Sequence, residues 1–342
     1  MSEYRAYRMP IRSLCALAVA ALLVPALAGC NTSPPEPRSK KAKREAMAKA
    51  PDTKSTSPED GAAKAPRREP HKYRLAHVFV ALCDNAHQGI VKVPPAIGNG
   101  QDPAGNLYWG APYGVKTFFS KSADWAAVPI IGTPKNAAVL DRCIFRSTGK
   151  GRTTYVVAEA YDGARMPAIL QEFLNAAAGR TVTEFDIPAD HGKMRLQAGG
   201  YADLVAFVGH NGLMDIQLDD YPEKLTDDNP GAAVVLACKS QKYFEGPLGR
   251  AGCRPLVMTS QFMAPEAYTL EAILRSWGAG DASDGIARKA AAAYAKYQKI
   301  KLAAAQKVFV VPAEPRATAA AHPRATPAAP SPTPLAERQP VG

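Results

Sequence analysis

Five short runs of consecutive apolar residues recur through the middle of the chain. Several are rich in β-branched residues, and each one stops at a polar or glycine-containing turn. Runs that are apolar on both faces are typical of strands in a parallel sheet whose two faces are covered by helices. The runs span residues 77–83, 153–158, 203–208, 232–237 and 255–260.

Segments with helical periodicity lie between and after these runs. Residues 165–178 have apolar side chains on one face, with Pro167 in the first turn and Gly179 just past the end. Residues 265–277 and the Ala-rich residues 283–306 show a similar spacing. This alternation predicts an α/β fold with a mainly parallel sheet and helices on both faces.

The N-terminus has the parts of an export signal. Arg5 and Arg12 belong to a basic start, and an apolar stretch over residues 14–27 leads to the sequence Leu-Ala-Gly-Cys ending at Cys30. The stretch is shorter than the roughly 20 apolar residues of a membrane-spanning helix. Residues 1–29 are therefore predicted to be a cleaved signal peptide.

The Leu-Ala-Gly-Cys ending resembles the lipobox of bacterial lipoproteins. This resemblance implies a lipid on Cys30, a membrane as partner and, from Asn31, the outer membrane as destination. The alternative is an ordinary signal with a coincidental cysteine. Residues 30–70, rich in Pro, Lys and Ser, are expected to form the lipidated cysteine and a disordered tether. The Ala- and Pro-rich residues 313–342 are expected to be disordered as well.

Residues 71–312 are long enough to form one large domain, which is predicted to be the α/β domain. Residues 1–70 carry +6 of the net charge of +11, and the predicted domain carries +4. A mildly basic, exported domain with no basic and aromatic stripe is not expected to bind nucleic acid. A basic tether is suited to anionic lipid headgroups.

Four cysteines remain in the predicted domain, which is expected to fold in an oxidising compartment. Cys83, Cys143, Cys238 and Cys253 would ordinarily form two disulfides, and the sequence leaves their pairing open. The chain has no Cys-x-x-Cys motif and no Cys/His spacing of a zinc site, so neither a metal nor another cofactor is predicted.

A long connection follows the first apolar run. Residues 89–131 are rich in Gly, Pro, Asn and aromatic residues. Connections of this length are often functional, but the aromatic side chains could equally pack against the domain.

The residues that end the apolar runs are the candidates for a site. In open α/β sheets, ligands bind at the carboxyl ends of the strands. Asp84 and Asn85 follow the first run, and Asp162 follows the second; these three are predicted to bind substrate. His210 and Cys238 follow the third and fourth runs and are predicted to be catalytic, because an imidazole can activate a thiol for attack on a carbonyl.

An apolar run ending in a histidine and the next one ending in Ala-Cys resemble the pattern of caspase-like cysteine peptidases, which include caspases, gingipains, clostripain and legumain. The matching segments are residues 204–212 and 234–238. The resemblance implies that His210 is the catalytic histidine and that Cys238 is the nucleophile. It also implies that the backbone N–H groups of Gly212 and Cys238 bind the oxyanion.

The sequence departs from this pattern at two positions. Asn211 stands where the family usually has Gly, and Lys239 follows the cysteine where many members soon have Gly. His210 and Gly212 could therefore be turn residues, and Cys238 a core residue or half of a disulfide. Three nearby acidic residues could bind a basic substrate group or a cation, or form a solvated loop. They are Asp215, Asp219 and Asp220.

Two functions follow from these residues. The first is a cell-envelope lipoprotein whose domain is a Cys/His-dependent peptidase that hydrolyses peptide or amide bonds. The second is a non-catalytic envelope protein that keeps the fold to bind or scaffold a protein partner. In the second case the aromatic and Gly-rich residues 98–125 would form the contact surface.

Overall fold

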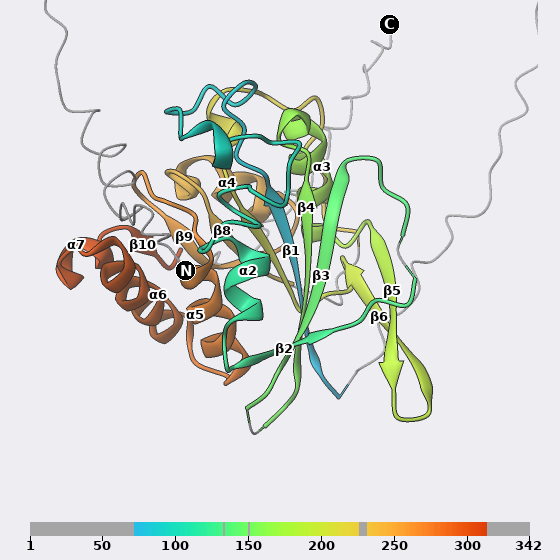
Figure 1. Ribbon diagram of the computed structural model, residues 1–342. Helices are drawn as coiled ribbons and strands as arrows, with labels where there is room; N and C mark the ends of the chain where they lie inside the picture. The colour runs from blue at the N-terminus through green and yellow to red at the C-terminus, as the bar shows by residue number, and fades with distance from the viewer. Residues whose placement is uncertain (1–71, 133, 150, 226–230, 313–342) are drawn as a thin grey trace, which may run out of the picture. The chain divides into compact units, whose positions relative to one another are not determined.

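The computed structural model describes residues 72–132, 134–149, 151–225 and 231–312. The strands are β1 (Arg74–Ala81), β2 (Trp125–Val128), β3 (Val139–Ser147), β4 (Thr154–Tyr161), β5 (Val182–Ala189), β6 (Gly192–Gly199), β7 (Leu204–Val208), β8 (Ala232–Leu236), β9 (Arg254–Thr259) and β10 (Phe309–Val310). Eight of them form one sheet in the order β10-β9-β8-β7-β1-β4-β3-β2 (Figure 1). The strands from β9 to β4 in this order are parallel, whereas β10, β3 and β2 run antiparallel to their neighbours. Strands β5 and β6 pair with each other in a separate hairpin.

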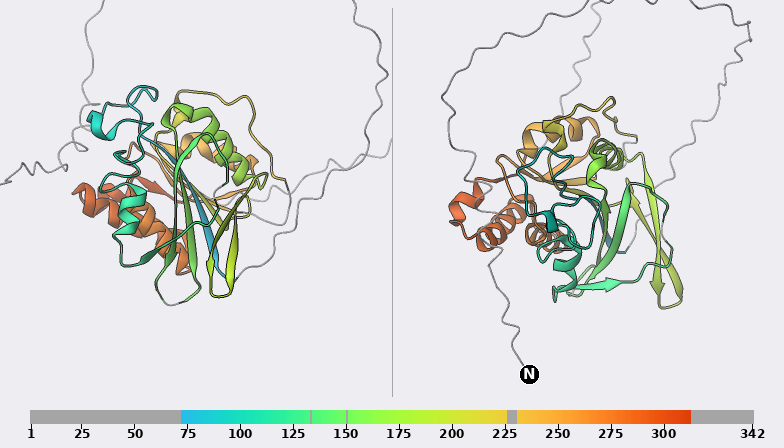
Figure 2. Two further views of the ribbon diagram at one scale, coloured as in Figure 1. Left: turned by 45° about the vertical axis from the view of Figure 1, so that its right-hand side comes forward. Right: turned by 45° about the horizontal axis from the view of Figure 1, so that its top comes forward.

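Helices cover both faces of the sheet (Figures 1 and 2). The α-helices are α2 (Val115–Ser120), α3 (Met166–Ala177), α4 (Ser240–Arg250), α5 (Ala267–Gly278), α6 (Ser283–Gln298) and α7 (Leu302–Gln306). The short 3₁₀ helices are η2 (Pro95–Ile97), η3 (Gly163–Arg165) and η4 (Gly212–Met214). One core cluster joins the sheet to α2, α5, α6 and α7. A second joins the opposite face to α3, α4 and the β5–β6 hairpin.

The predicted α/β class with a mainly parallel sheet is confirmed. Each of the five apolar runs overlaps one of the five parallel strands, β1, β4, β7, β8 and β9. Strands β7 and β8 are buried along their whole length, which explains why their sequences are apolar at every position.

The structure revises one predicted helix and shows how the long connection packs. The predicted helix over residues 283–306 is interrupted, because Lys299 adopts left-handed backbone angles (φ 54°, ψ 40°) and ends α6. Within the connection over residues 89–131, Trp109 and Phe119 are fully buried. The aromatic side chains of this segment therefore contribute largely to the core.

The topology defines where a ligand would bind. The chain passes from β1 to β4 on one side of β1 and then returns to β7 on its other side. In sheets of this kind, the crevice at the carboxyl ends of the strands next to such a reversal is the usual binding position. His210 follows β7, and Cys238 follows the neighbouring β8.

Candidate functional site

His210 and Cys238 lie at equivalent positions beyond two neighbouring parallel strands. Val208, the last residue of β7, pairs with Leu236, the last residue of β8. His210 lies two positions after Val208, and Cys238 lies two positions after Leu236. Because adjacent strands lie about 4.8 Å apart, this register brings the backbones of the two candidates to the same level of the sheet edge.

Asn211 extends the pairing of the two strands into the site. The Gly209 N–H donates to the carbonyl of Leu236 at 3.2 Å, and the Nδ2 of Asn211 donates to the carbonyl of Cys238 at 2.6 Å. The side-chain amide thus takes the place of the next backbone hydrogen bond between the two parallel strands. Asn211 is fully buried, and its Oδ1 has no hydrogen-bond partner among the described residues. The departure from the family pattern at this position has a structural role that the sequence did not reveal.

Gly209 and Gly212 allow the chain to turn sharply at the end of β7. Gly209 has φ 147°, and a Cβ there would lie 2.8 Å from the carbonyl oxygen of Ala81. The Gly212 N–H donates to the carbonyl of His210 at 3.1 Å as η4 begins. Gly212 is therefore a turn residue whose N–H is already bonded within the protein. Its role in binding an oxyanion stays a prediction and would require this bond to open.

His210 is paired with a carboxylate that follows η4. Its Nε2 lies 2.5 Å from the Oδ2 of Asp215. The His210 side chain is 14% exposed, whereas Asp215 is 55% exposed. The histidine is therefore held at the edge of the sheet by an acidic neighbour that reaches it from solvent.

The thiol of Cys238 is covered by the segment that follows β9. Its Sγ lies 3.5 Å from both the backbone N and the backbone O of Met263. Burial raises the pKa of the Cys238 thiol, and the Met263 bond and the charge of Lys239 offset this only in part. The resting thiol is consequently protonated at neutral pH.

Lys239 directs the chain from the cysteine into α4. It has left-handed backbone angles (φ 48°, ψ 38°), and its N–H donates to the carbonyl of Gln261 at 2.9 Å. Its ammonium group lies 4.3 Å from the ring centroid of Phe262, a side chain that is 39% exposed. Non-glycine residues in this conformation are uncommon and cluster at functional sites.

The predicted substrate-binding residues after β1 are engaged in internal hydrogen bonds. Asp84 is buried, and its carboxylate accepts bonds from the His87 ring at 2.8 Å and from Gln101 at 2.9 Å. Burial alone would raise the pKa of Asp84, but these bonds and the Ala86 N–H lower it below its usual value. The Asn85 side chain accepts from the Val93 N–H at 2.9 Å and donates to the Val93 carbonyl at 2.8 Å.

Asp162, the third predicted substrate-binding residue, lies close to Asp84. Gln101 Nε2 donates to Asp162 at 2.6 Å as well as to Asp84, so one amide links the ends of β1 and β4. Asp162 also accepts from the Ala164 N–H at the start of η3. The structure brings the two carboxylates to one amide group, while their role in substrate binding stays a prediction.

The expectation of two disulfides is wrong. No disulfide joins the four cysteines of the described residues. Ala232 pairs with Arg254, which places Cys253 at the amino ends of β8 and β9, whereas Cys238 lies past the carboxyl end of β8. Cys253 therefore lies level with Gly231, seven positions before Cys238, and at about 3.3 Å per residue this separation is far beyond the 7 Å limit for the Cα atoms of a disulfide.

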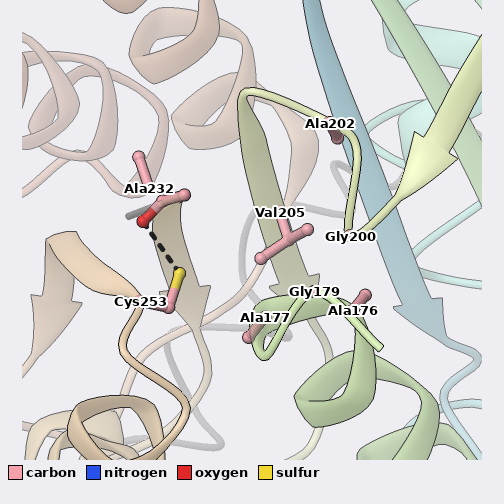
Figure 3. Close-up of a pocket in the computed structure, with 9 residues that line it drawn as sticks. Ala176, Ala177, Gly179, Gly200, Ala202, Val205, Ala232 and Cys253 are labelled. Carbon is pink, nitrogen blue, oxygen red and sulfur yellow. Dashed lines mark hydrogen bonds between the residues drawn. The ribbon is translucent and has the colours of Figure 1, made fainter. Parts of the chain in front are cut away.

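A small cavity beside Cys253 lies at the amino end of the sheet and not at the candidate site. It has a volume of about 10 Å³, room for one water molecule, and is lined mainly by Ala and Gly residues such as Ala177 and Gly200 (Figure 3). The Cys253 sulfur donates to the carbonyl of Gly231 at 3.0 Å. Burial raises the pKa of this thiol to about 12, which makes it an unreactive reference for Cys238.

The sequence predictions about metal binding and about the membrane concern different parts of the chain. Within residues 72–132, 134–149, 151–225 and 231–312, no group of three His, Cys, Asp or Glu side chains could hold a metal ion. Over the same residues, no helix is both long and apolar enough to cross a membrane. The predicted signal peptide, Cys30, the tether and the C-terminal tail lie outside the described residues.

Comparisons of the chain with models of protein families, with curated proteins and with solved structures found no match.

Proposed function

We propose that the folded domain is a caspase-like cysteine peptidase in which Cys238 is the nucleophile and His210 the general base. The observation that carries this proposal is the shared register of the two residues beyond β7 and β8. Consecutive strands that are also adjacent in the sheet are the arrangement that the family resemblance implies. The left-handed Lys239 and the buried clamp of Asn211 give further support, because both fix the backbone of Cys238.

The reaction divides into two steps. In the first, the thiol proton moves to the imidazole of His210, and the sulfur attacks the carbonyl carbon of the scissile amide. The intermediate then expels the amine, which takes the proton from the imidazolium, and a thioester remains on Cys238. In the second step, water attacks the thioester, releasing the carboxylic acid and restoring the thiol.

The test uses full-length protein and a mixed library of fluorogenic peptide amides, with matched peptidyl acyloxymethyl ketones as covalent probes. Wild type should release the fluorogenic amine, and one or more probes should modify Cys238. C238A and H210A should each lower hydrolysis at least about 100-fold. The matched control is C253S, which should retain activity because that thiol is buried at the other end of the sheet. Full activity of C238A would refute the proposal.

The second candidate is a non-catalytic binding protein, and two observations favour it. The Cys238 thiol is covered by Met263 and has a raised pKa. A groove of about 810 Å³ is lined partly by the aromatic connection before β2 and partly by α5 and α6. Its lining includes Tyr113, Phe118, Lys121, Arg275 and Tyr297. This candidate predicts that none of the peptidyl probes modifies Cys238.

We further propose that the protein is anchored in the cell envelope, at the outer membrane, through lipid on Cys30. The support is the lipobox-like sequence that ends at this cysteine. Wild type should partition into the detergent phase, whereas C30S should not, with the melting temperature of the domain unchanged. Equal partitioning of both proteins into the aqueous phase would contradict the anchor.

A further inference from the structure

The contact between His210 and Asp215 determines which ring nitrogen is basic. An ionised carboxylate only accepts hydrogen bonds, so the Nε2 that lies 2.5 Å from Asp215 Oδ2 must carry the proton. A neutral imidazole has one N–H, and the lone pair therefore resides on Nδ1. The carboxylate thus selects one of the two tautomers of His210.

The backbone between the two residues builds this contact. The N–H groups of Asp215 and Ile216 both donate to the carbonyl of Gly212, at 3.0 Å and 2.9 Å. Gly212 packs so closely on α3 that a Cβ would lie 2.3 Å from the Cγ of Met166. This tight turn returns Asp215 to His210, so the carboxylate is placed by the fold of the turn.

Other carboxylates in the same segment do not share this position. Asp219 and Asp220 are exposed, and neither contacts His210 in the described part of the chain. The acidic residues after His210 were predicted as one group that binds a basic ligand or a cation, or is simply solvated. The structure separates Asp215 from the others.

We propose that Asp215 is a positioning residue that holds His210 in the Nε2–H tautomer, with Nδ1 as the atom that receives the Cys238 proton. This inference rests on the proposed peptidase function. During attack by the sulfur, Nδ1 takes the thiol proton and the ring becomes an imidazolium. The Nε2–H stays shared with Asp215, which remains ionised and stabilises the positive ring. When the amine leaves, it takes the proton back from Nδ1.

The decisive measurement is long-range ¹H–¹⁵N NMR of the histidine rings in the full-length protein above pH 7.5, with His210 assigned by its loss in H210Q. Wild type should show the Nε2–H tautomer. D215A should show a mixture, and D215N should restore the wild-type pattern in part, because its amide oxygen can accept from Nε2–H. The matched control D219N should leave the pattern unchanged. An Nδ1–H tautomer in wild type, or no change in D215A, would overturn the inference.

A kinetic measurement separates positioning from folding. D215A should lower kcat for the best peptide amide at least about tenfold while KM stays within twofold, and D215N should lie between D215A and wild type. An unchanged kcat in D215A would count against the positioning role. If C238A retains activity, the peptidase proposal fails on its own, and the NMR result still decides whether Asp215 sets the tautomer.

Discussion

The buried charge network beneath the β5–β6 hairpin gives the clearest test of how this fold is held together. Glu159 on β4 is 1% exposed and accepts bonds from Arg142 at 2.6 Å and from His77 at 3.0 Å. His77 in turn accepts the Gly199 N–H of β6 on its Nδ1, at 3.0 Å. The His77 ring is therefore neutral and donates through Nε2. One carboxylate thus connects β1, β3, β4 and the hairpin.

The substitution E159Q should cost about 3 kcal/mol of unfolding free energy. A glutamine amide has one acceptor oxygen for the two N–H donors of His77 and Arg142, and it leaves a guanidinium that is only 12% exposed without its counter-charge. Breaking a buried ion pair from one side costs about 3–5 kcal/mol, and the retained acceptor places the estimate at the lower end. For a folded region of this size, the melting temperature should fall by about 6–12 °C.

Urea unfolding followed by far-UV circular dichroism measures this loss. The matched control is E184Q on the hairpin, since Glu184 is 43% exposed and pairs with Arg195 at 3.1 Å. That change should cost less than about 0.5 kcal/mol. The double variant E159Q/R142M should regain part of the loss, because the unpaired guanidinium is then removed. A loss below about 1 kcal/mol for E159Q would show that the Glu159 network contributes little to holding β1, β3, β4 and the hairpin together.

Three shorter predictions concern the same core and the site. Burial would raise the pKa of Glu159, but the bonds from His77 and Arg142 lower it below the unfolded value of about 4.3. The contribution of Glu159 to stability is therefore present above the unfolded pKa and is lost as the pH falls through the folded pKa. The urea midpoints of wild type and E159Q should converge once the pH is below that folded pKa. K239G should be about 1 kcal/mol more stable than K239A in thermal unfolding. The left-handed conformation of residue 239 crowds a β-carbon, which alanine has and glycine lacks. N211D should lose about 2–3 kcal/mol by placing an oxygen against the Cys238 carbonyl, and N211A should lose less because it also removes the unpartnered Oδ1.

The parallel strands were predictable because each is buried on both faces and so has a continuous apolar sequence. The elements that sequence analysis missed lack this signal. Strand β3 contains Asp141 and Arg142, which interrupt its apolar pattern. Arg142 belongs to the buried network around Glu159. Helix α4 contains Pro247 between two glycines and is stabilised mainly by Phe244 and Leu248, which are buried against the sheet. Tertiary packing outweighs local propensity in both cases.

The candidate site, like the fold, was predictable from the sequence only in part. The order of the apolar runs was enough to predict that His210 and Cys238 end consecutive strands, and the register places them side by side. The contacts that complete the site depend on how loops fold back. Asp215 reaches His210 through a turn set by Gly212, and Met263 reaches Cys238 from 25 positions further along the chain. No periodicity in a single sequence encodes such contacts.

The covering of Cys238 by Met263 leads to a last prediction about the resting thiol. Iodoacetamide reacts with the thiolate, and burial holds the pKa of Cys238 above its ordinary value. Alkylation of Cys238 at pH 7 should therefore be slower than that of free cysteine and should rise with pH beyond the range where free cysteine has levelled off.

Mass spectrometry of tryptic peptides distinguishes the thiols in this experiment, with the buried Cys253 as the unreactive reference. Rapid alkylation of Cys238 below pH 7 would show that the covered state is not the resting one. Slow alkylation is compatible with the proposed peptidase function, in which His210 would take the proton of the neutral thiol only when substrate is bound. A substrate-like probe, which supplies the carbonyl that the sulfur would attack, is therefore the reagent that separates an enzyme from a binding protein.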